Sequence, residues 1–180
     1  ELRRREEQQV ASELGDQFER LFENIEADAV ASPQPRSGTT VFVGSPATNP
    51  HIARLFVKWP DLSDQGIVIQ SIPEHRIYAV GGGSPSATLW AVYELGHRLG
   101  IRYLPRGDMY PLPKKTFSLA GTDTVMEPQL RSRTWRTIND FAIGPESWGI
   151  DEQRSHLRQL AKLKFNRVMI SVYPWQPFVS

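Results

Sequence analysis

Apolar residues near the N-terminus recur at intervals of three and four, which places them on one stripe of an α-helix. The other faces of this segment carry mostly Glu, Gln and Arg, and the pattern predicts an amphipathic helix that packs one face on a core. Residues 31–38 contain two prolines and a glycine without periodicity, so they predict a linker or exposed loop. The apolar stripe comprises Val10, Leu14, Phe18, Leu21, Phe22 and Ile25.

The middle of the chain alternates between strand-like and helix-like patterns. Asn49-Pro50 predicts the cap and first turn of a short helix through Lys58, and Ser84-Pro85 predicts the start of a helix that ends at Gly100. The second helix is apolar on nearly all sides, which predicts a central position. Strands are expected at 39–43, 66–72, 76–81 and 101–104, with one more near 117, and the pair joined by 73–75 is expected to be an antiparallel hairpin.

From Pro128 onward the pattern is strand, helix, strand. The strands are expected at 133–139 and 168–173, and the helix at 151–164 with Leu157, Leu160 and Ala161 inward. This order predicts a βαβ unit with two parallel, adjacent strands. We therefore expect an α+β fold: residues 1–128 form a domain with a small mixed, largely antiparallel sheet and helices on one face, and residues 129–180 begin a second unit.

Composition excludes several classes of protein. The 180 residues include 21 Lys plus Arg against 20 Asp plus Glu, a net charge of +1, whereas a nucleic-acid surface needs a clustered basic excess. The absence of Cys removes disulfide frameworks, thiol nucleophiles and thiolate metal sites. No apolar run approaches the roughly 18 residues of a membrane span. The four histidines lack the spacing of metal ligands, so we expect neither a metal nor a cofactor.

A glycine-rich turn, Gly81-Gly82-Gly83-Ser84, precedes the second predicted helix. Backbone amides at a helix N-terminus bind phosphate, which makes nucleotide binding one interpretation. A dinucleotide fingerprint would need Gly in place of Ser86, and the lysine of a phosphate-binding loop is missing. The pattern favours a plain strand-to-helix turn in which a side chain would not fit.

Polar and aromatic residues follow both strands of the C-terminal unit, and the carboxyl ends of barrel strands line the active-site face of a (β/α)8 barrel. Aromatic rings stack on sugar faces, while Arg, Asn and Asp form directional hydrogen bonds with hydroxyl groups, so the mixture suits a carbohydrate pocket. The alternative treats Trp135, Trp148 and Trp175 as packing residues and Asp140 as a loop cap, and both interpretations stay open. The candidate substrate-binding residues are Arg136, Asn139, Asp140, Tyr173 and Trp175.

Two stretches resemble a known arrangement. GGGSPSATLWAVYEL at 81–95, followed by LGIRYLP at 99–105, resembles the helix and final strand of the small α/β domain that precedes the barrel in β-N-acetylhexosaminidases and α-glucuronidases. LAKLKFNRV at 160–168 is similar to the entry into the second barrel strand of these families. The resemblance covers residues 39–175 and implies a hexosaminidase domain 2-like fold followed by the start of a truncated (β/α)8 barrel.

The resemblance also implies a function. Arg136-Thr137-Ile138-Asn139 is similar to the Arg-x-x-Asn of the first α-glucuronidase barrel strand, whereas Arg133-Thr134 departs from the Arg-Gly of hexosaminidases. It implies the N-terminal, non-catalytic part of a secreted or periplasmic glycoside hydrolase, with a signal peptide absent from this chain. Its partners would be a carbohydrate and the rest of the barrel, whose later strands hold the catalytic carboxylates in both families. The alternative is a non-catalytic carbohydrate-binding or structural module.

Overall fold

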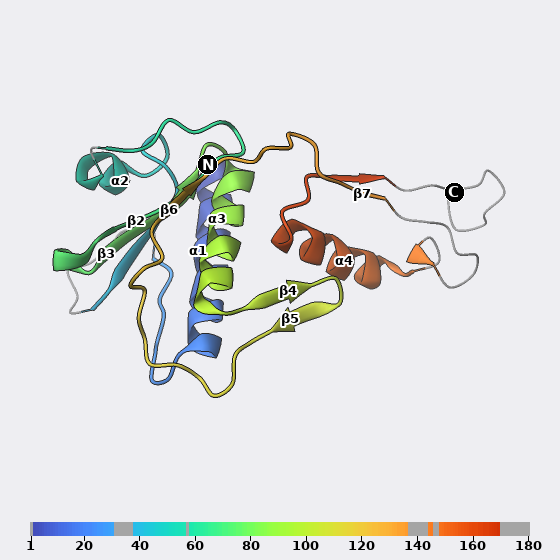
Figure 1. Cartoon of the computed structure of the whole chain (residues 1–180), viewed down its shortest axis with the longest axis horizontal. Coiled ribbons are helices and arrows are strands. Elements are labelled where there is room, and N and C mark those ends of the chain that lie inside the picture. Colours follow the sequence, from blue (N-terminus) through green and yellow to red (C-terminus); the bar gives the residue numbers. More distant parts are fainter. Residues whose placement is uncertain (1, 31–37, 57, 137–143, 146–147, 170–180) are drawn as a thin grey trace. The chain divides into compact units, whose positions relative to one another are not determined.

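The computed structural model describes residues 2–30, 38–56, 58–136, 144–145 and 148–169 (Figure 1). The chain divides into two compact units. The first unit contains residues 1–102 and 110–129, and the second contains residues 103–109 and 130–180. The short hairpin at 103–109 therefore groups with the C-terminal part of the chain.

A four-stranded mixed sheet forms the centre of the first unit. Its order is β1-β3-β2-β6, with β1 (Thr40–Val43) parallel to β3 (Ile77–Gly82), and with β2 (Ile67–Ile72) antiparallel to both β3 and β6 (Thr124–Met126). The hairpin of β2 and β3 is confirmed; a turn of 3-10 helix, η1 (Pro73–His75), joins its strands. The mixed, largely antiparallel sheet within an α+β fold is confirmed as well.

Helices cover both faces of this sheet, so the expectation of helices on one face is wrong. The long helices α1 (Leu2–Leu21) and α3 (Pro85–Leu99) pack together, and α3 lies over β2 and β3. On the opposite face, α2 (Pro50–Leu55) packs its Ile52 against Phe42 and Ala79 (Figure 1). The physical reason lies in β3, where neighbouring Ala79 and Val80 point to opposite faces and both are fully buried.

The central position predicted for the second helix is confirmed. Ser84 caps α3 by accepting a hydrogen bond from the Ala87 amide at 3.1 Å, and Pro85 opens its first turn. The helix ends at Gly100, whose φ of 112° lies in the left-handed region that glycine adopts without strain. Ten of its fifteen residues are buried.

The segment between the hairpin and β6 contains no strand near Phe117, which corrects the prediction. Lys115 instead forms a single bridge with Phe22 at the end of α1, and the Phe117 ring packs edge-on against Phe18 and Phe22 at 5.9 and 5.0 Å between centroids. The segment around Phe117 lies against α1 because the Phe117 ring packs with Phe18 and Phe22 in the core. Its apolar residues therefore reflect packing rather than strand formation.

The second unit contains a hairpin and a βαβ arrangement. The hairpin joins β4 (Arg102–Leu104) to β5 (Gly107–Met109), while β7 (Thr134–Arg136) pairs in parallel with β8 (Arg167–Met169). The parallel pairing, with α4 (Ile150–Lys162) between the two strands in sequence, confirms the prediction. The predicted strand residues 137–139 and 170–173 lie outside the described residues.

The inward face of α4 differs from the one predicted. Leu160 is buried as expected, but Leu157 is 47% exposed, and His156 takes the buried position one turn before Leu160. Residues four apart share one helix face, so the stripe of His156 and Leu160 leaves Leu157 to one side. No helix in the described part of the chain is long and apolar enough to cross a membrane.

Candidate functional site at the carboxyl ends of β7 and β8

The amino ends of β7 and β8 are held together by side-chain hydrogen bonds. The Asn166 side chain accepts from the Arg133 amide at 2.8 Å and donates to the Arg131 carbonyl at 2.8 Å. Arg133 Nε donates to the carbonyl of Lys164 at 2.7 Å, just beyond the end of α4. Burial lowers the pKa of the Arg133 guanidinium from its ordinary value. Asn166, the Asn of the LAKLKFNRV stretch, thus helps to hold β7 and β8 in register, which is a structural role.

The opposite end of this unit is the candidate site. Arg136, the last described residue of β7, pairs in register with Met169, the last described residue of β8, and the chain beyond each of them (137–143 and 170–180) lies outside the described residues. Because α4 ends beside the amino ends of the strands, its N-terminus points toward their carboxyl ends, and Figure 1 shows this end of α4 on the side of the strand arrowheads. Arg136 is exposed, and no described residue pairs with its guanidinium.

Arg136 lies in a parallel strand, within the predicted range 133–139, and its role in substrate binding stays a prediction. It is the only one of the five candidate residues that the structure describes. The other four, Asn139, Asp140, Tyr173 and Trp175, lie outside the described residues.

An aromatic cluster packs between β7 and α4. The Trp135 ring, from the middle of β7, meets the His156 ring at 5.7 Å and the Phe165 ring at 5.5 Å between centroids, both close to edge-on. The Trp148 ring lies edge-on against His156 at 5.3 Å from the N-terminal side of α4. Trp135 is thus a packing residue, as the alternative interpretation of the sequence held, while Trp148 keeps 38% of its surface exposed.

His156 occupies an apolar position within this cluster. Only 8% of its surface is exposed, and its Nε2 is buried without a hydrogen-bond partner among the described residues. Burial disfavours the charged imidazolium and lowers the pKa of His156 below its ordinary value. The ring is therefore held neutral and serves as an aromatic spacer between two tryptophans.

A buried polar network joins the hairpin to α4 inside the second unit. Lys162 Nζ lies 2.5 Å from Asp108 Oδ2, and the two side chains are only 13% and 9% exposed. The Gln159 amide, oriented to satisfy both of its polar atoms, donates to Asp108 Oδ1 and to the Leu104 carbonyl at 3.0 Å each. Sequence reasoning missed this network; the only signal was the shared face of Gln159 and Lys162, three residues apart on a helix.

The glycine-rich turn is explained by close packing in the first unit. A Cβ atom at Gly81 would lie 1.7 Å from the Gly44 carbonyl oxygen, and one at Gly83 would lie 1.9 Å from the Ser63 carbonyl oxygen. Backbone thus occupies the space that side chains would need. The prediction that glycine is needed in this strand-to-helix turn because a side chain would not fit is confirmed.

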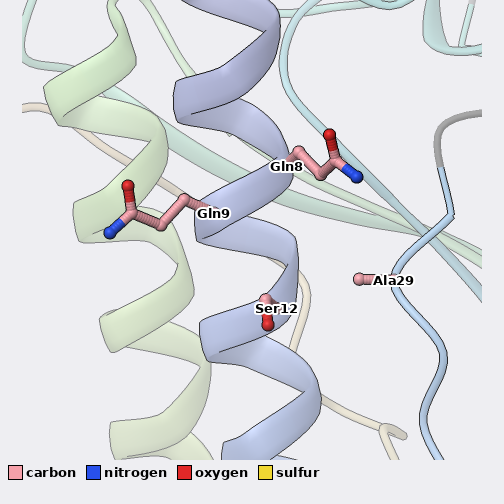
Figure 2. A pocket seen from close by; sticks show the side chains of 4 residues that line it. All are labelled: Gln8, Gln9, Ser12 and Ala29. Atoms are coloured by element: carbon pink, nitrogen blue, oxygen red, sulfur yellow. The ribbon is translucent and has the colours of Figure 1, made fainter.

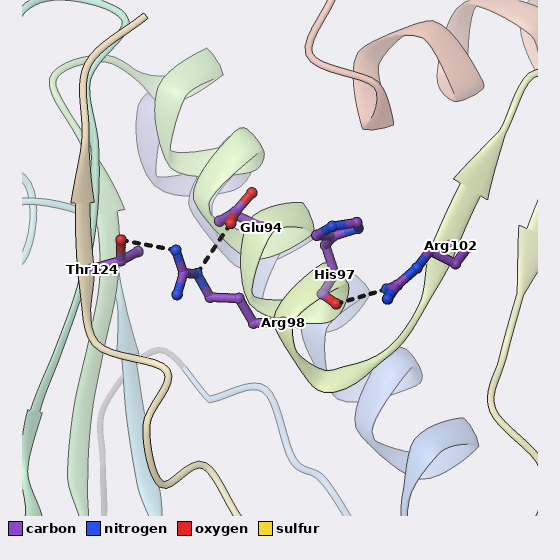
Figure 3. A network of polar contacts seen from close by, with 5 residues as sticks. All are labelled: Glu94, His97, Arg98, Arg102 and Thr124. Carbon is purple, nitrogen blue, oxygen red and sulfur yellow. Dashed lines mark hydrogen bonds and ion pairs between the residues drawn. The ribbon is translucent and has the colours of Figure 1, made fainter.

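The C-terminal end of α3 carries a polar network that is structural. Arg98 donates to Glu94 Oε1 and to Thr124 Oγ1 of β6 at 3.0 Å each, and Arg102 donates to the carbonyl of His97 at 3.0 Å (Figure 3). Cationic groups at this end of a helix interact favourably with its dipole. The network ties α3 to edge strand β6 through Arg98, which is a structural role.

The surface of α1 carries a shallow depression of about 420 Å³, lined by Gln8, Gln9, Ser12 and Ala29. Figure 2 shows Gln8 and Gln9 pointing to different sides of the helix, so their amides do not converge on one point. All four residues are exposed, and none is titratable. The depression therefore lacks the groups that acid, base or nucleophilic chemistry requires.

Within the described ranges, no group of three or more His, Asp or Glu side chains is placed to hold a metal ion. Comparison of the chain with models of known protein families, with curated proteins and with solved structures finds no match. Arg136, exposed at the last described position of β7 opposite Met169 of β8, is the candidate site residue.

Proposed function

We propose that this chain is the N-terminal, non-catalytic part of a secreted or periplasmic glycoside hydrolase that acts on polysaccharide or oligosaccharide. The resemblance of its first barrel strand favours an α-glucuronidase-like enzyme over a β-N-acetylhexosaminidase-like one. The catalytic carboxylates would come from later strands of the same barrel. The present residues would contribute one wall of the substrate site.

The observation that supports the proposal is the exposed position of Arg136 in β7, the first strand of a parallel βαβ unit, next to the undescribed residues that lead on toward α4. In (β/α)8 enzymes the substrate binds at the carboxyl ends of the strands. A guanidinium offers parallel N–H donors that match a carboxylate, so Arg136 is suited to a uronic acid. A neutral N-acetylhexosamine has no carboxylate that could accept both parallel hydrogen bonds from the guanidinium.

The apolar surface of the second unit also supports the proposal. Val168 and Met169 of β8 are 37% and 51% exposed, and Ile150 and Leu157 of α4 are exposed as well. Strands of parallel sheets are normally buried on both faces by neighbouring βα units. Further βα units of a barrel would cover these side chains.

The test is steady-state hydrolysis by the full-length gene product on oligosaccharides that carry either glucuronic acid or N-acetylglucosamine. We expect cleavage of the glucuronide and, for Arg136→Ala, a rise in KM of at least about tenfold, since a charge-assisted pair contributes roughly 1.5–3 kcal/mol. Arg136→Lys should recover part of the loss because it keeps the charge but not the planar fork. Arg158→Ala, an exposed arginine in the middle of α4, is the matched control and should leave KM unchanged.

Two results would contradict the proposal. Absence of hydrolysis and of binding with both substrates would remove the glycoside hydrolase function. Equal kinetics for the wild type and Arg136→Ala on a cleaved glucuronide would leave the enzyme class but remove the role given to this end of β7.

A further inference from the structure

Strand β6 is an open edge of the sheet in the first unit. It stands last in the order β1-β3-β2-β6, and in the described part of the chain it pairs with β2 alone. Two of its three residues, Val125 and Met126, are 51% and 40% exposed. Edge strands present unpaired backbone groups, and proteins often guard them with Lys or Pro. β6 contains neither residue type.

The hydrogen-bond pattern of β2 shows in which direction its backbone groups point. The Gly83 amide donates to the Gly66 carbonyl at 3.1 Å, so the polar groups of even-numbered residues in β2 face β3. Those of odd-numbered residues face β6. The Ser71 amide agrees with this alternation, because it donates to the Asp123 carboxylate at 3.3 Å.

The register of β6 then assigns its own backbone groups. Ile67 and Ile69 pair with Met126 and Thr124, so these two residues of β6 form the ladder bonds with β2. The N–H and C=O of Val125 point the other way, out of the sheet. They have no hydrogen-bond partner among the described residues. One donor and one acceptor are therefore available at the centre of the open edge.

Two carboxylates lie on either side of Val125, at a distance of two residues each. Asp123 accepts a hydrogen bond from Ser71 Oγ at 2.8 Å, and Glu127 accepts one from Ser63 Oγ at 2.6 Å. The serines hold the carboxylates in place but do not neutralise them. Within the described ranges, neither carboxylate has a cation at ion-pair distance. The open edge is thus anionic at both ends.

The charges argue against a second copy of this chain as the occupant of the edge. Antiparallel pairing of two copies about Val125 would place Asp123 of one copy beside Glu127 of the other. Parallel pairing would place each carboxylate beside its own equivalent. Like charges that face each other across two strands destabilise the pair. On the opposite face of β6, Thr124 already accepts from Arg98, which also pairs with Glu94 (Figure 3).

Beyond the proposed function, we infer that the open edge of β6 is a docking site for an extended, basic segment of a partner protein. The segment adds to the sheet as a fifth strand and exchanges backbone hydrogen bonds with Val125. It carries an apolar residue opposite Val125, and Lys or Arg two positions to each side of that residue. These cations lie next to Asp123 and Glu127, whose charge selects a basic partner over an acidic one.

The experiment titrates the full-length gene product into a fluorescein-labelled peptide, Thr-Lys-Thr-Val-Thr-Lys-Thr with blocked ends, and follows fluorescence anisotropy. We expect saturable binding, with a Kd at least about tenfold lower than that of the same peptide with Glu in place of both Lys. Methylation of the central valine nitrogen should abolish binding because it removes the donor to the Val125 carbonyl. This peptide keeps the charges and so isolates the backbone contribution.

Variants of the protein test the same contacts from the other side. Val125→Pro removes the outward N–H and should raise the Kd about tenfold, while the fold tolerates Pro at such an edge position. Val125→Thr keeps the N–H and should bind as the wild type does. Asp123→Asn and Glu127→Gln should each raise the Kd about two- to fivefold. Glu74→Gln, at an exposed position in η1, is the matched control and should leave it unchanged.

Four results would overturn the inference. Equal affinity for the Lys and Glu peptides would remove the basic partner. Binding that survives both the methylated peptide and Val125→Pro would place the peptide elsewhere on the protein. Absence of saturable binding would remove the docking site. Dimerisation of the wild type in sedimentation experiments that Val125→Pro abolishes would assign the edge to a second copy. Far-UV circular dichroism of each variant confirms that a loss of binding is not a loss of folding.

Discussion

The two compact units differ in how they treat their edges. In the first unit, serine–carboxylate pairs flank edge strand β6: Ser71 Oγ donates to Asp123 at 2.8 Å, and Ser63 Oγ donates to Glu127 at 2.6 Å. In the second unit, all three residues of β8 are exposed, including Val168. Val125 and Met126 of β6 are themselves 51% and 40% exposed, so the two edges differ in their side-chain anchoring and not in the exposure of their apolar residues. Strands of parallel sheets, such as β7 and β8, are normally covered on both faces.

The helix ends show the same contrast. In the first unit, adjacent Lys114 and Lys115 each donate to a carbonyl near the C-terminus of a different long helix, at Glu19 and Leu99. In the second unit, the N-cap residue of α4, Gly149, offers no side-chain cap, and an exposed tryptophan precedes it. Both units therefore use polar side chains to hold their elements together, but Arg136 of the second unit is exposed and has no partner among the described residues. Four predictions test these differences.

The largest effect is expected inside the second unit, at its buried ion pair. Lys162→Met leaves the Asp108 carboxylate buried without its cation, and breaking such a pair costs roughly 3–5 kcal/mol of stability. Urea unfolding followed by far-UV circular dichroism measures the loss. The double variant Asp108→Asn with Lys162→Met should recover much of it because no unpaired charge remains. A single variant as stable as the wild type would show that the pair does not hold the hairpin to α4.

The next effect tests the packing of the first unit. Gly81→Ala places a Cβ atom against the Gly44 carbonyl oxygen, so the two strands must separate, at a cost of about 3 kcal/mol. Gly15→Ala in α1 is the matched control, since its Cβ would meet Ala27 only at 3.5 Å. The control should gain up to about 1 kcal/mol from helix propensity. Thermal unfolding that shows no difference between the two variants would refute the close approach.

A smaller effect is expected at the N-cap of α3. Ser84→Ala removes the acceptor of the Ala87 amide and should cost about 1 kcal/mol. Ser84→Asp should retain stability because aspartate also caps helices. Chemical denaturation of the three proteins is the measurement. Equal loss in both variants would mean that the hydroxyl serves something other than capping, which would reopen a ligand role for this turn.

The smallest effect is the pH dependence contributed by His156. Its pKa is lowered in the folded state, so the unfolded chain binds the proton first as the pH falls. Stability from the neutral ring is therefore fully present above the ordinary histidine pKa of about 6.5 and declines as the pH falls toward the lowered value. Urea midpoints at pH 7.5 and pH 5 should differ less in His156→Gln than in the wild type. His75→Gln, at an exposed position, should retain the wild-type difference.

Local patterns predicted most of the first unit because its elements carry strong signals. Ser84, Pro85 and Gly100 marked the ends of α3, and the spacing around residues 73–75 marked the hairpin. The position of α2 on the opposite face escaped prediction because it depends on burial of both sides of β3, which a six-residue strand does not reveal. Phe117 was misassigned because an apolar residue that completes a core has the same local pattern as a short strand.

Of the five candidate site residues, the structure describes Arg136 alone, and the substrate-binding role given to all five stays a prediction. The Asp108–Lys162 pair joins residues 54 positions apart, and no local pattern connects them. The spacing of the histidines argued against a metal site but gave His156 no role, and its burial between two tryptophans defines it as a packing residue. Such contacts depend on the docking of a hairpin and a helix, which sequence periodicity does not encode.

The central claim is that the carboxyl ends of β7 and β8 contribute to a site for an acidic sugar. The most direct measurement is the melting temperature of the full-length gene product, with and without glucuronic acid, and with N-acetylglucosamine as the neutral comparison. A ligand at 100 times its Kd adds about 2.7 kcal/mol, so the account predicts a clear rise with glucuronic acid that Arg136→Ala abolishes. An unchanged melting temperature with glucuronic acid, or a rise that Arg136→Ala leaves intact, would contradict it.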